Sequence, residues 1–110
     1  MSLLHLIIHK EIIESELKAC NPERRKKLEE VLARIHEIEN NQTDVRYVDF
    51  DKSNPDNLDL DGIHHVVELC MGYKSVRLYG CSTNACLPFA KRRLESAGHD
   101  VVYDEKGVID

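Results

Sequence analysis

The sequence predicts a small three-layer α/β/α domain of the Rossmann-like type, with a four-stranded, mainly parallel sheet. Three observations lead to this prediction. Short apolar runs of strand length alternate with longer segments in which apolar residues recur at helical spacing. Turn-forming and helix-capping residues separate these segments. The chain has 110 residues, which is enough for one modest core, so we expect a single domain over residues 1–110.

The first half of the chain is expected to form two strands and one long helix. Residues 3–8 are a continuous apolar run, which is typical of a buried parallel strand. Residues 11–20 allow one or two helical turns. Asn21 followed by Pro22 predicts the start of a helix, since asparagine is a good N-cap and proline suits the first helical position. Apolar residues then repeat at helical spacing as far as Glu39, and residues 44–50 form the next predicted strand.

The second half is expected to alternate in the same way. After a polar loop over residues 51–57, Asp61 is expected to cap a helix that closes at Gly72. A strand from Ser75 to Tyr79 runs into a tight loop of small residues. The following helix begins no earlier than about Asn84 and stops at Gly98, and residues 100–103 make the last strand. We expect right-handed crossovers between parallel strands. The strand order that we expect is 2-1-3-4.

Candidate functional residues gather where the predicted strands end. Ligands of such sheets bind beyond the carboxyl ends of the strands, at the point where the chain changes direction. The residues expected there are His9, Asp51 with Lys52, the loop from Cys81 to Cys86, and Asp104 with Glu105. The thiol of Cys86 is expected at a helix N-terminus, where free N–H groups and the helix dipole favour thiolate. The sequence therefore predicts nucleophilic chemistry at Cys86.

The loop before this helix resembles the nucleophile loop of a known family. The family pattern is a Gly, two small or apolar residues, a Thr, an Asn or Asp, any residue, the nucleophilic Cys and a Val or similar residue. Those positions are occupied in register by Gly80, Thr83, Asn84, Cys86 and Leu87. The chain thus resembles the isochorismatase-like cysteine hydrolases, which include nicotinamidases. The resemblance covers about residues 58–105, and the first half of the chain matches only loosely.

The resemblance implies that the Cys86 thiolate attacks an amide-type C–N bond of a small molecule. In the family an Asp after the first strand and a Lys after a middle strand assist the cysteine. Lys52 fits the position of the Lys, whereas His9 stands where the Asp is expected. An imidazole can also activate a thiol. The backbone N–H groups of Ser82 and Cys86 would stabilise the oxyanion, with a cis peptide bond between Cys81 and Ser82 turning the first of them toward it.

The missing Asp keeps two other functions open. A family member without turnover could serve as a binding or oligomerisation module. Alternatively, Cys81 and Cys86 could belong to a thiol-redox or sulfurtransferase-like domain, although they lack the Cys-x-x-Cys spacing of thioredoxin-like sites. A carboxylate or imidazole within hydrogen-bond reach of Cys86 would distinguish the hydrolase from both.

Composition and charge limit the partners that we expect. The formal net charge of −5 argues against nucleic acid. No run approaches the roughly 20 apolar residues of a membrane span. The absence of an export signal predicts a cytoplasmic protein with reduced thiols. The adjacent His64 and His65 would point in different directions on a helix and would not readily chelate one metal ion. We expect neither a metal nor a cofactor. The long amphipathic helix over residues 22–39 predicts a homodimer.

Overall fold

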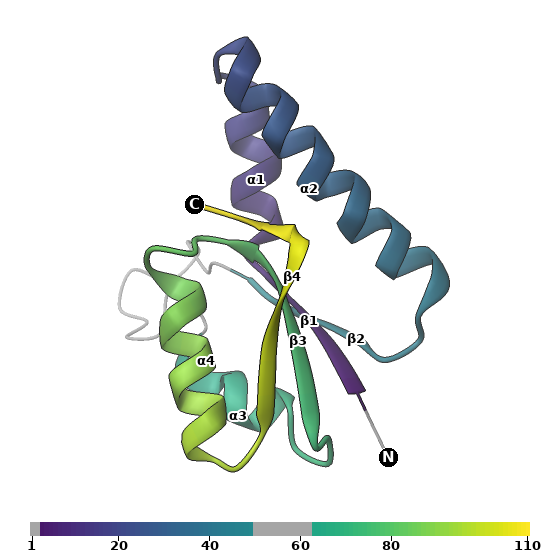
Figure 1. Ribbon diagram of the computed structural model, residues 1–110, viewed down its shortest axis with the longest axis vertical. Coiled ribbons are helices and arrows are strands. Elements are labelled where there is room, and N and C mark those ends of the chain that lie inside the picture. Colours follow the sequence, from purple (N-terminus) through teal and green to yellow (C-terminus); the bar gives the residue numbers. More distant parts are fainter. Residues whose placement is uncertain (1–2, 50–62) are drawn as a thin grey trace.

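Four parallel strands form the sheet of the protein (Figure 1). The computed structural model describes residues 3–49 and 63–110. In these residues the strands are β1 (Leu3–Ile8), β2 (Val45–Val48), β3 (Ser75–Cys81) and β4 (Asp100–Ile109). They lie side by side in the order β2-β1-β3-β4, and each neighbouring pair is parallel. Both the predicted fold class and the predicted strand order are confirmed.

Helices cover both faces of this sheet (Figure 1). One face carries α1 (Lys10–Leu17) and α2 (Pro22–Asn41), and the other carries α3 (Val66–Leu69) and α4 (Cys86–Ser96). The predicted start of α2 is confirmed, because the Asn21 side chain accepts a hydrogen bond from the backbone N–H of Arg24 at 2.8 Å. No helix in the described residues is long and apolar enough to cross a membrane.

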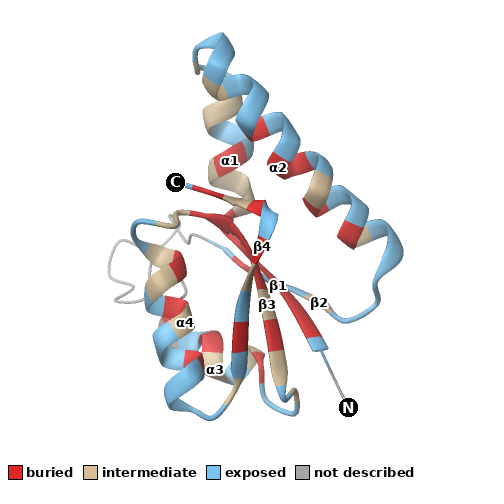
Figure 2. Ribbon diagram, in the orientation of Figure 1, coloured by how far each residue is buried: buried red, intermediate tan, exposed pale blue. Residues whose placement is uncertain are grey.

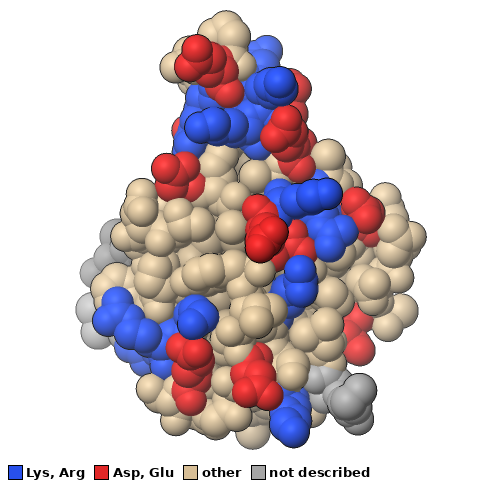
Figure 3. All heavy atoms as spheres, in the orientation of Figure 1, with Lys and Arg blue, Asp and Glu red and all other residues tan. Residues whose placement is uncertain are grey.

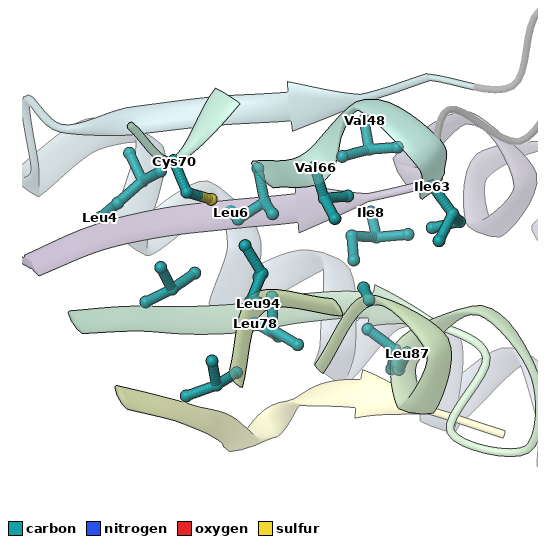
Figure 4. Packing of buried hydrophobic residues seen from close by; sticks show 13 residues of the cluster. Leu4, Leu6, Ile8, Val48, Ile63, Val66, Cys70, Leu78, Leu87 and Leu94 are labelled. Atoms are coloured by element: carbon teal, nitrogen blue, oxygen red, sulfur yellow. The ribbon is translucent and has the colours of Figure 1, made fainter. Parts of the chain in front are cut away.

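The core consists of two apolar clusters, one on each face of the sheet. Alternate residues of β1 supply both, because Leu4, Leu6 and Ile8 face α3 and α4 while Ile7 faces α1 and α2. Figure 4 shows the first cluster, in which side chains of β1 and β3 meet those of α3 and α4. The two central strands are buried over most of their length (Figure 2). Burial on both faces explains why residues 3–8 form an uninterrupted apolar run.

The last strand differs most from the prediction. It continues to Ile109, whereas the sequence predicted its end at Tyr103. Tyr103 lies opposite Leu78 and Val108 lies opposite Gly80, so residues 104–107 of β4 all lie opposite one residue of β3. These four polar or small residues form a bulge within the strand. The predicted placement of Asp104 and Glu105 at the carboxyl end of the sheet is therefore wrong.

The helix before β3 also differs from the prediction. It starts as a 3₁₀ turn, η1 (Ile63–His65), and continues as the short α3. His65 has φ −99° and ψ 2°, which lie outside the helical region and interrupt a continuous α-helix. The predicted cap, Asp61, lies outside the described residues. The second strand is shorter than predicted, since β2 ends at Val48 and Asp49 already lies outside it.

Candidate functional site

The candidate site lies where the chain leaves two neighbouring strands in opposite directions. His9 follows β1, and the chain then runs to α1 on one face. Cys81 ends β3, and the chain then runs to α4 on the other face. The Cys81 thiol donates a hydrogen bond to the His9 carbonyl oxygen, with the sulfur 3.7 Å away. The structure thus brings His9 and the cysteine loop together at the topological switch point, as predicted.

Gly80 is required by the close approach of β1 and β3. Its φ is +110°, a region that side-chain-bearing residues rarely adopt. A Cβ atom on Gly80 would overlap the carbonyl oxygen of Ile8 on the neighbouring strand. The first position of the loop motif therefore has a packing reason to be glycine.

The loop between β3 and α4 is a compact turn closed by Ser82. Its carbonyl oxygen accepts hydrogen bonds from the backbone N–H groups of Ala85 and Leu87, both at 3.1 Å. The N–H of Asn84 donates to the Ser82 hydroxyl at 3.3 Å. These bonds set the start of α4, so that Cys86 is the first residue of the helix. The predicted place of Cys86 at a helix N-terminus is confirmed.

The peptide bond between Cys81 and Ser82 is cis, as the family resemblance implies. The N–H of Thr83 donates to the carbonyl oxygen of Ile109 at 3.1 Å and attaches the loop to the end of β4. The convergence of the Ser82 and Cys86 amides on one oxyanion stays a prediction.

The four thiols have different surroundings, and all four are free. Cys70 and Cys81 are buried, and burial raises the pKa of each to about 11. These two thiols are therefore protonated at neutral pH. Cys86 is partly exposed and packs at the edge of the cluster between the sheet and α3 and α4. Cys20 is also partly exposed, but it lies near the far end of α1, where its thiol donates to the carbonyl oxygen of Leu17.

His9 is fixed at the end of β1 by its backbone. It is only 1% exposed and has a left-handed conformation, with φ 57° and ψ 43°. Its N–H donates to the carbonyl oxygen of Val48 at 2.9 Å, and its carbonyl oxygen accepts from the N–H of Ile12 at 3.0 Å. The position of His9 beside the loop agrees with the prediction, and its role as a base stays a hypothesis. Lys52 lies outside the described residues.

Sequence reasoning missed a large cleft between α2 and the end of β4. Its volume is about 790 Å³. Thr83 and Asn84 of the loop line one end, but Cys86 does not take part in its lining. The helix N-terminus that carries Cys86 packs on the opposite face of the sheet. In the described residues no group of three or more His, Cys, Asp or Glu side chains could hold a metal ion.

Sequence reasoning also missed a polar cluster beside this cleft. The Asp104 carboxylate is 1% exposed and accepts hydrogen bonds from Arg34 Nη2 at 2.9 Å and Arg77 Nε at 3.0 Å. Burial acts to raise the pKa of Asp104, but the hydrogen bonds from the two guanidinium groups outweigh it and lower the pKa. Nearby, His5 Nδ1 lies 2.7 Å from the hydroxyl oxygen of Tyr79. Arg77 lies inside the strand predicted from Ser75 to Tyr79. A charged residue there indicates that an oppositely charged partner is needed, but it does not indicate which residue that partner is.

Comparison of the chain with protein-family models, with curated proteins and with solved structures gives no match. The fold and the site together define an α/β domain with a cysteine-bearing loop at the switch point of a parallel sheet. The resemblance to isochorismatase-like hydrolases rests on the residues of that loop.

Proposed function

We propose that the protein is a small cysteine hydrolase of the isochorismatase-like kind, which cleaves an amide-type C–N bond of a small molecule. One observation carries this proposal. Cys86 is the first residue of α4 and follows a compact loop at the switch point, where Cys81 of that loop contacts His9. A partly exposed thiol at a helix N-terminus is placed to form a thiolate.

The reaction would proceed through an acylated Cys86. The thiolate adds to the carbonyl carbon, and the backbone amides of Ser82 and Cys86 hold the oxyanion. The C–N bond then breaks, and the nitrogen leaves as an amine after it receives a proton. Water next cleaves the thioester and restores the thiol. In this scheme His9 takes the proton from Cys86 and passes it to the leaving amine, while Lys52 takes the place of the family lysine.

The other cysteines help to separate the candidate functions. A thiol-redox function would need Cys81 as the second reactive thiol. Cys81 is buried, and burial raises its pKa to about 11. A protonated, buried thiol is a poor nucleophile, which disfavours the redox alternative. The four free thiols suit a reducing compartment such as the cytoplasm.

Release of ammonia from a panel of primary amides, nicotinamide among them, tests the proposal. We expect turnover by the native protein and none by Cys86→Ala. Cys20→Ala is the matched control, since it removes the other partly exposed thiol and should leave turnover unchanged. In His9→Gln turnover should fall and no acylated Cys86 should accumulate, because the proton transfers of the acylation step are lost; intact-mass spectrometry checks that no covalent adduct forms. Turnover that survives in Cys86→Ala, or ammonia from no amide of the panel, contradicts the proposal.

A second candidate function is that of a homodimeric binding module. The hairpin of α1 and α2 extends away from the sheet (Figure 1), and α2 is 20 residues long. Such a projecting hairpin suits pairing of two copies around a two-fold axis. Light scattering at about 50 µM, well above a Kd of about 1 µM, tests this candidate. A dimer without amide turnover favours the module, and a monomer contradicts it.

A further inference from the structure

Two grooves meet where α2 lies beside the bulge of β4. The larger has a volume of about 790 Å³ and the smaller about 410 Å³. Four residues line both grooves, namely Arg34, Glu37, Glu105 and Lys106. Figure 3 shows basic and acidic side chains gathered in this part of the surface, beside a wider uncharged area. The two grooves are therefore neighbours with these four charged residues between them, and we refer to the pair as the cleft.

The buried carboxylate of Asp104 does not neutralise the two guanidinium groups beside it. Arg34 donates to Asp104 through Nε and Nη2, and to Glu37 through Nη1 at 3.0 Å. Arg77 donates to the same Asp104 carboxylate through Nε. Two positive charges thus share one buried negative charge, while Glu37 is 59% exposed and is screened by water. Three basic residues, Arg34, Arg77 and Lys106, and three acidic residues, Glu37, Asp104 and Glu105, line the smaller groove, so an anion is attracted there by the local guanidinium donors and not by a net positive charge.

Arg77 retains hydrogen-bond donors for a ligand. A guanidinium group has five N–H donors. One donates to Asp104, and the neighbouring hydroxyl of Tyr79 can take one more. With the described residues as partners, at least three donors stay available. The Arg77 side chain is 36% exposed and lines the smaller groove, so these donors are accessible to an anion.

The residues after the bulge add a second cation and an apolar wall. Lys106 is exposed and lines both grooves. In the larger groove Val31, Val108 and Ile109 provide apolar surface. Glu37 and Glu105 line both grooves, Glu30 and Asp110 line the larger one, and these carboxylates oppose an anion there. The cleft thus places two cationic groups, Arg77 and Lys106, beside apolar surface.

We propose that this cleft binds a small amphipathic organic anion. Its carboxylate or phosphate head group lies against Arg77 and Lys106, and its aliphatic or aromatic body lies on Val31, Val108 and Ile109. Guanidinium groups bind both kinds of head group with paired hydrogen bonds. The volume of the larger groove falls within the range of small-molecule sites, about 300–1,000 Å³. The site stands apart from Cys86 and does not depend on the proposed hydrolase activity.

Three probes separate the head group from the body of the ligand. Hexanoate carries both, inorganic phosphate carries the head group alone, and hexanol carries the body alone. Each is titrated into the ¹⁵N-labelled full chain at constant ionic strength set with NaCl. We expect saturable amide shifts at residues 104–109 and around Arg34 with hexanoate, which should bind most tightly. Phosphate should shift residues near Arg77 and Lys106, and hexanol should bind most weakly.

Substitutions of the exposed Glu105 and Lys106 leave the core intact. Lys106→Gln should weaken hexanoate and phosphate about fivefold, and Glu105→Gln should strengthen both by about as much, because each removes one charge close to the head group. Val108→Ala should weaken hexanoate and leave phosphate unchanged. Lys91→Gln on α4 is the matched control and should change neither.

The proposal predicts opposite effects of the two neighbouring variants. Opposite changes at Glu105 and Lys106, with shifts confined to the cleft, support it. Equal shifts when NaCl replaces the probe at the same concentration, or shifts that centre on α4, overturn it. Equal affinities for hexanoate and phosphate overturn the apolar part of the site, and changes of the same sign in Glu105→Gln and Lys106→Gln overturn the anionic part.

Discussion

The sulfur of Cys81 lies 3.7 Å from the carbonyl oxygen of His9. This contact joins the end of β3 to the end of β1, the two strands between which the chain changes direction. One residue earlier, Gly80 lies opposite Ile8 in the same strand pair. The position of the cysteine loop thus depends on how closely these two strands approach each other.

Gly80→Ala tests that dependence. The added Cβ would overlap the carbonyl oxygen of Ile8, and φ at Gly80 is +110°. We expect the free energy of unfolding to fall by more than about 2 kcal/mol, measured by urea denaturation. Gly98→Ala is the control, because φ there is +96° but the added Cβ meets no atom within 4 Å. The control should lose only about 1 kcal/mol, and equal losses would contradict the close approach of β1 and β3.

The thiols should react with iodoacetamide in a defined order. Cys86 should be labelled first near neutral pH, since it is partly exposed at the N-terminus of α4. Cys70 and Cys81 should be labelled last, because they are buried and burial raises the pKa of each to about 11. Peptide mapping by mass spectrometry gives the order, and labelling in urea should abolish it. Faster labelling of Cys20 than of Cys86 would argue against the nucleophile.

Stability should decrease as the pH falls through the range in which histidine titrates. Burial, followed by the positive charges of Arg77 and Arg34, lowers the pKa of His5. A lowered pKa means that the unfolded chain binds the proton more readily than the native protein. The contribution of His5 to the free energy of unfolding is therefore fully present above the unfolded pKa of about 6.5. It is lost as the pH falls through the lower pKa of the folded protein.

Replacement of His5 by Asn should reduce this dependence. Urea midpoints between about pH 5 and 7 should change less in His5→Asn than in the native protein. His36→Gln is the control, because the His36 side chain is 56% exposed. An unchanged slope in His5→Asn, or an equal reduction in the control, would show that another group causes the pH dependence.

Asp104→Asn should lower stability at neutral pH by about 2–3 kcal/mol, because hydrogen bonds to charged groups are lost in a buried place. The folded pKa of Asp104 is lowered, so its contribution is present above the unfolded pKa of about 3.9 and disappears as the pH falls through the folded value. The stabilities of native and variant proteins should therefore converge in acid. Asp100→Asn, at an exposed position of the same strand, should cost little at any pH. Parallel curves for native protein and Asp104→Asn would contradict the lowered pKa.

The elements that were predicted correctly have local signals. The apolar run of residues 3–8 matches β1, and Asn21 with Pro22 sets the start of α2. The parallel topology then places the ends of β1 and β3 side by side, which is why His9 and the cysteine loop could be expected at one place. The strand order therefore predicts that His9 and the cysteine loop lie close together.

The features that were missed depend on contacts between distant residues. Asp104 pairs with Arg34, which is 70 residues away, and with Arg77, which is 27 residues away. The polar run of residues 104–107 has the composition of a turn, so it predicted the end of a strand. In the folded protein the two guanidinium groups satisfy Asp104, and the strand can continue to Ile109. The cleft beside the bulge follows from this pairing and has no local signal.

The bulge in β4 also affects whether another strand can pair with this edge of the sheet. Of the described strands, β4 is the last on its side, so its outer N–H and C=O groups face away from the sheet. Four of its residues lie opposite one residue of β3, which bends that rim. A straight strand from another molecule cannot add along the whole of a bent rim, and native sheets use such bends against aggregation. The same four residues that gather the charges around Asp104 thus also make the β4 rim a poor template for a further strand.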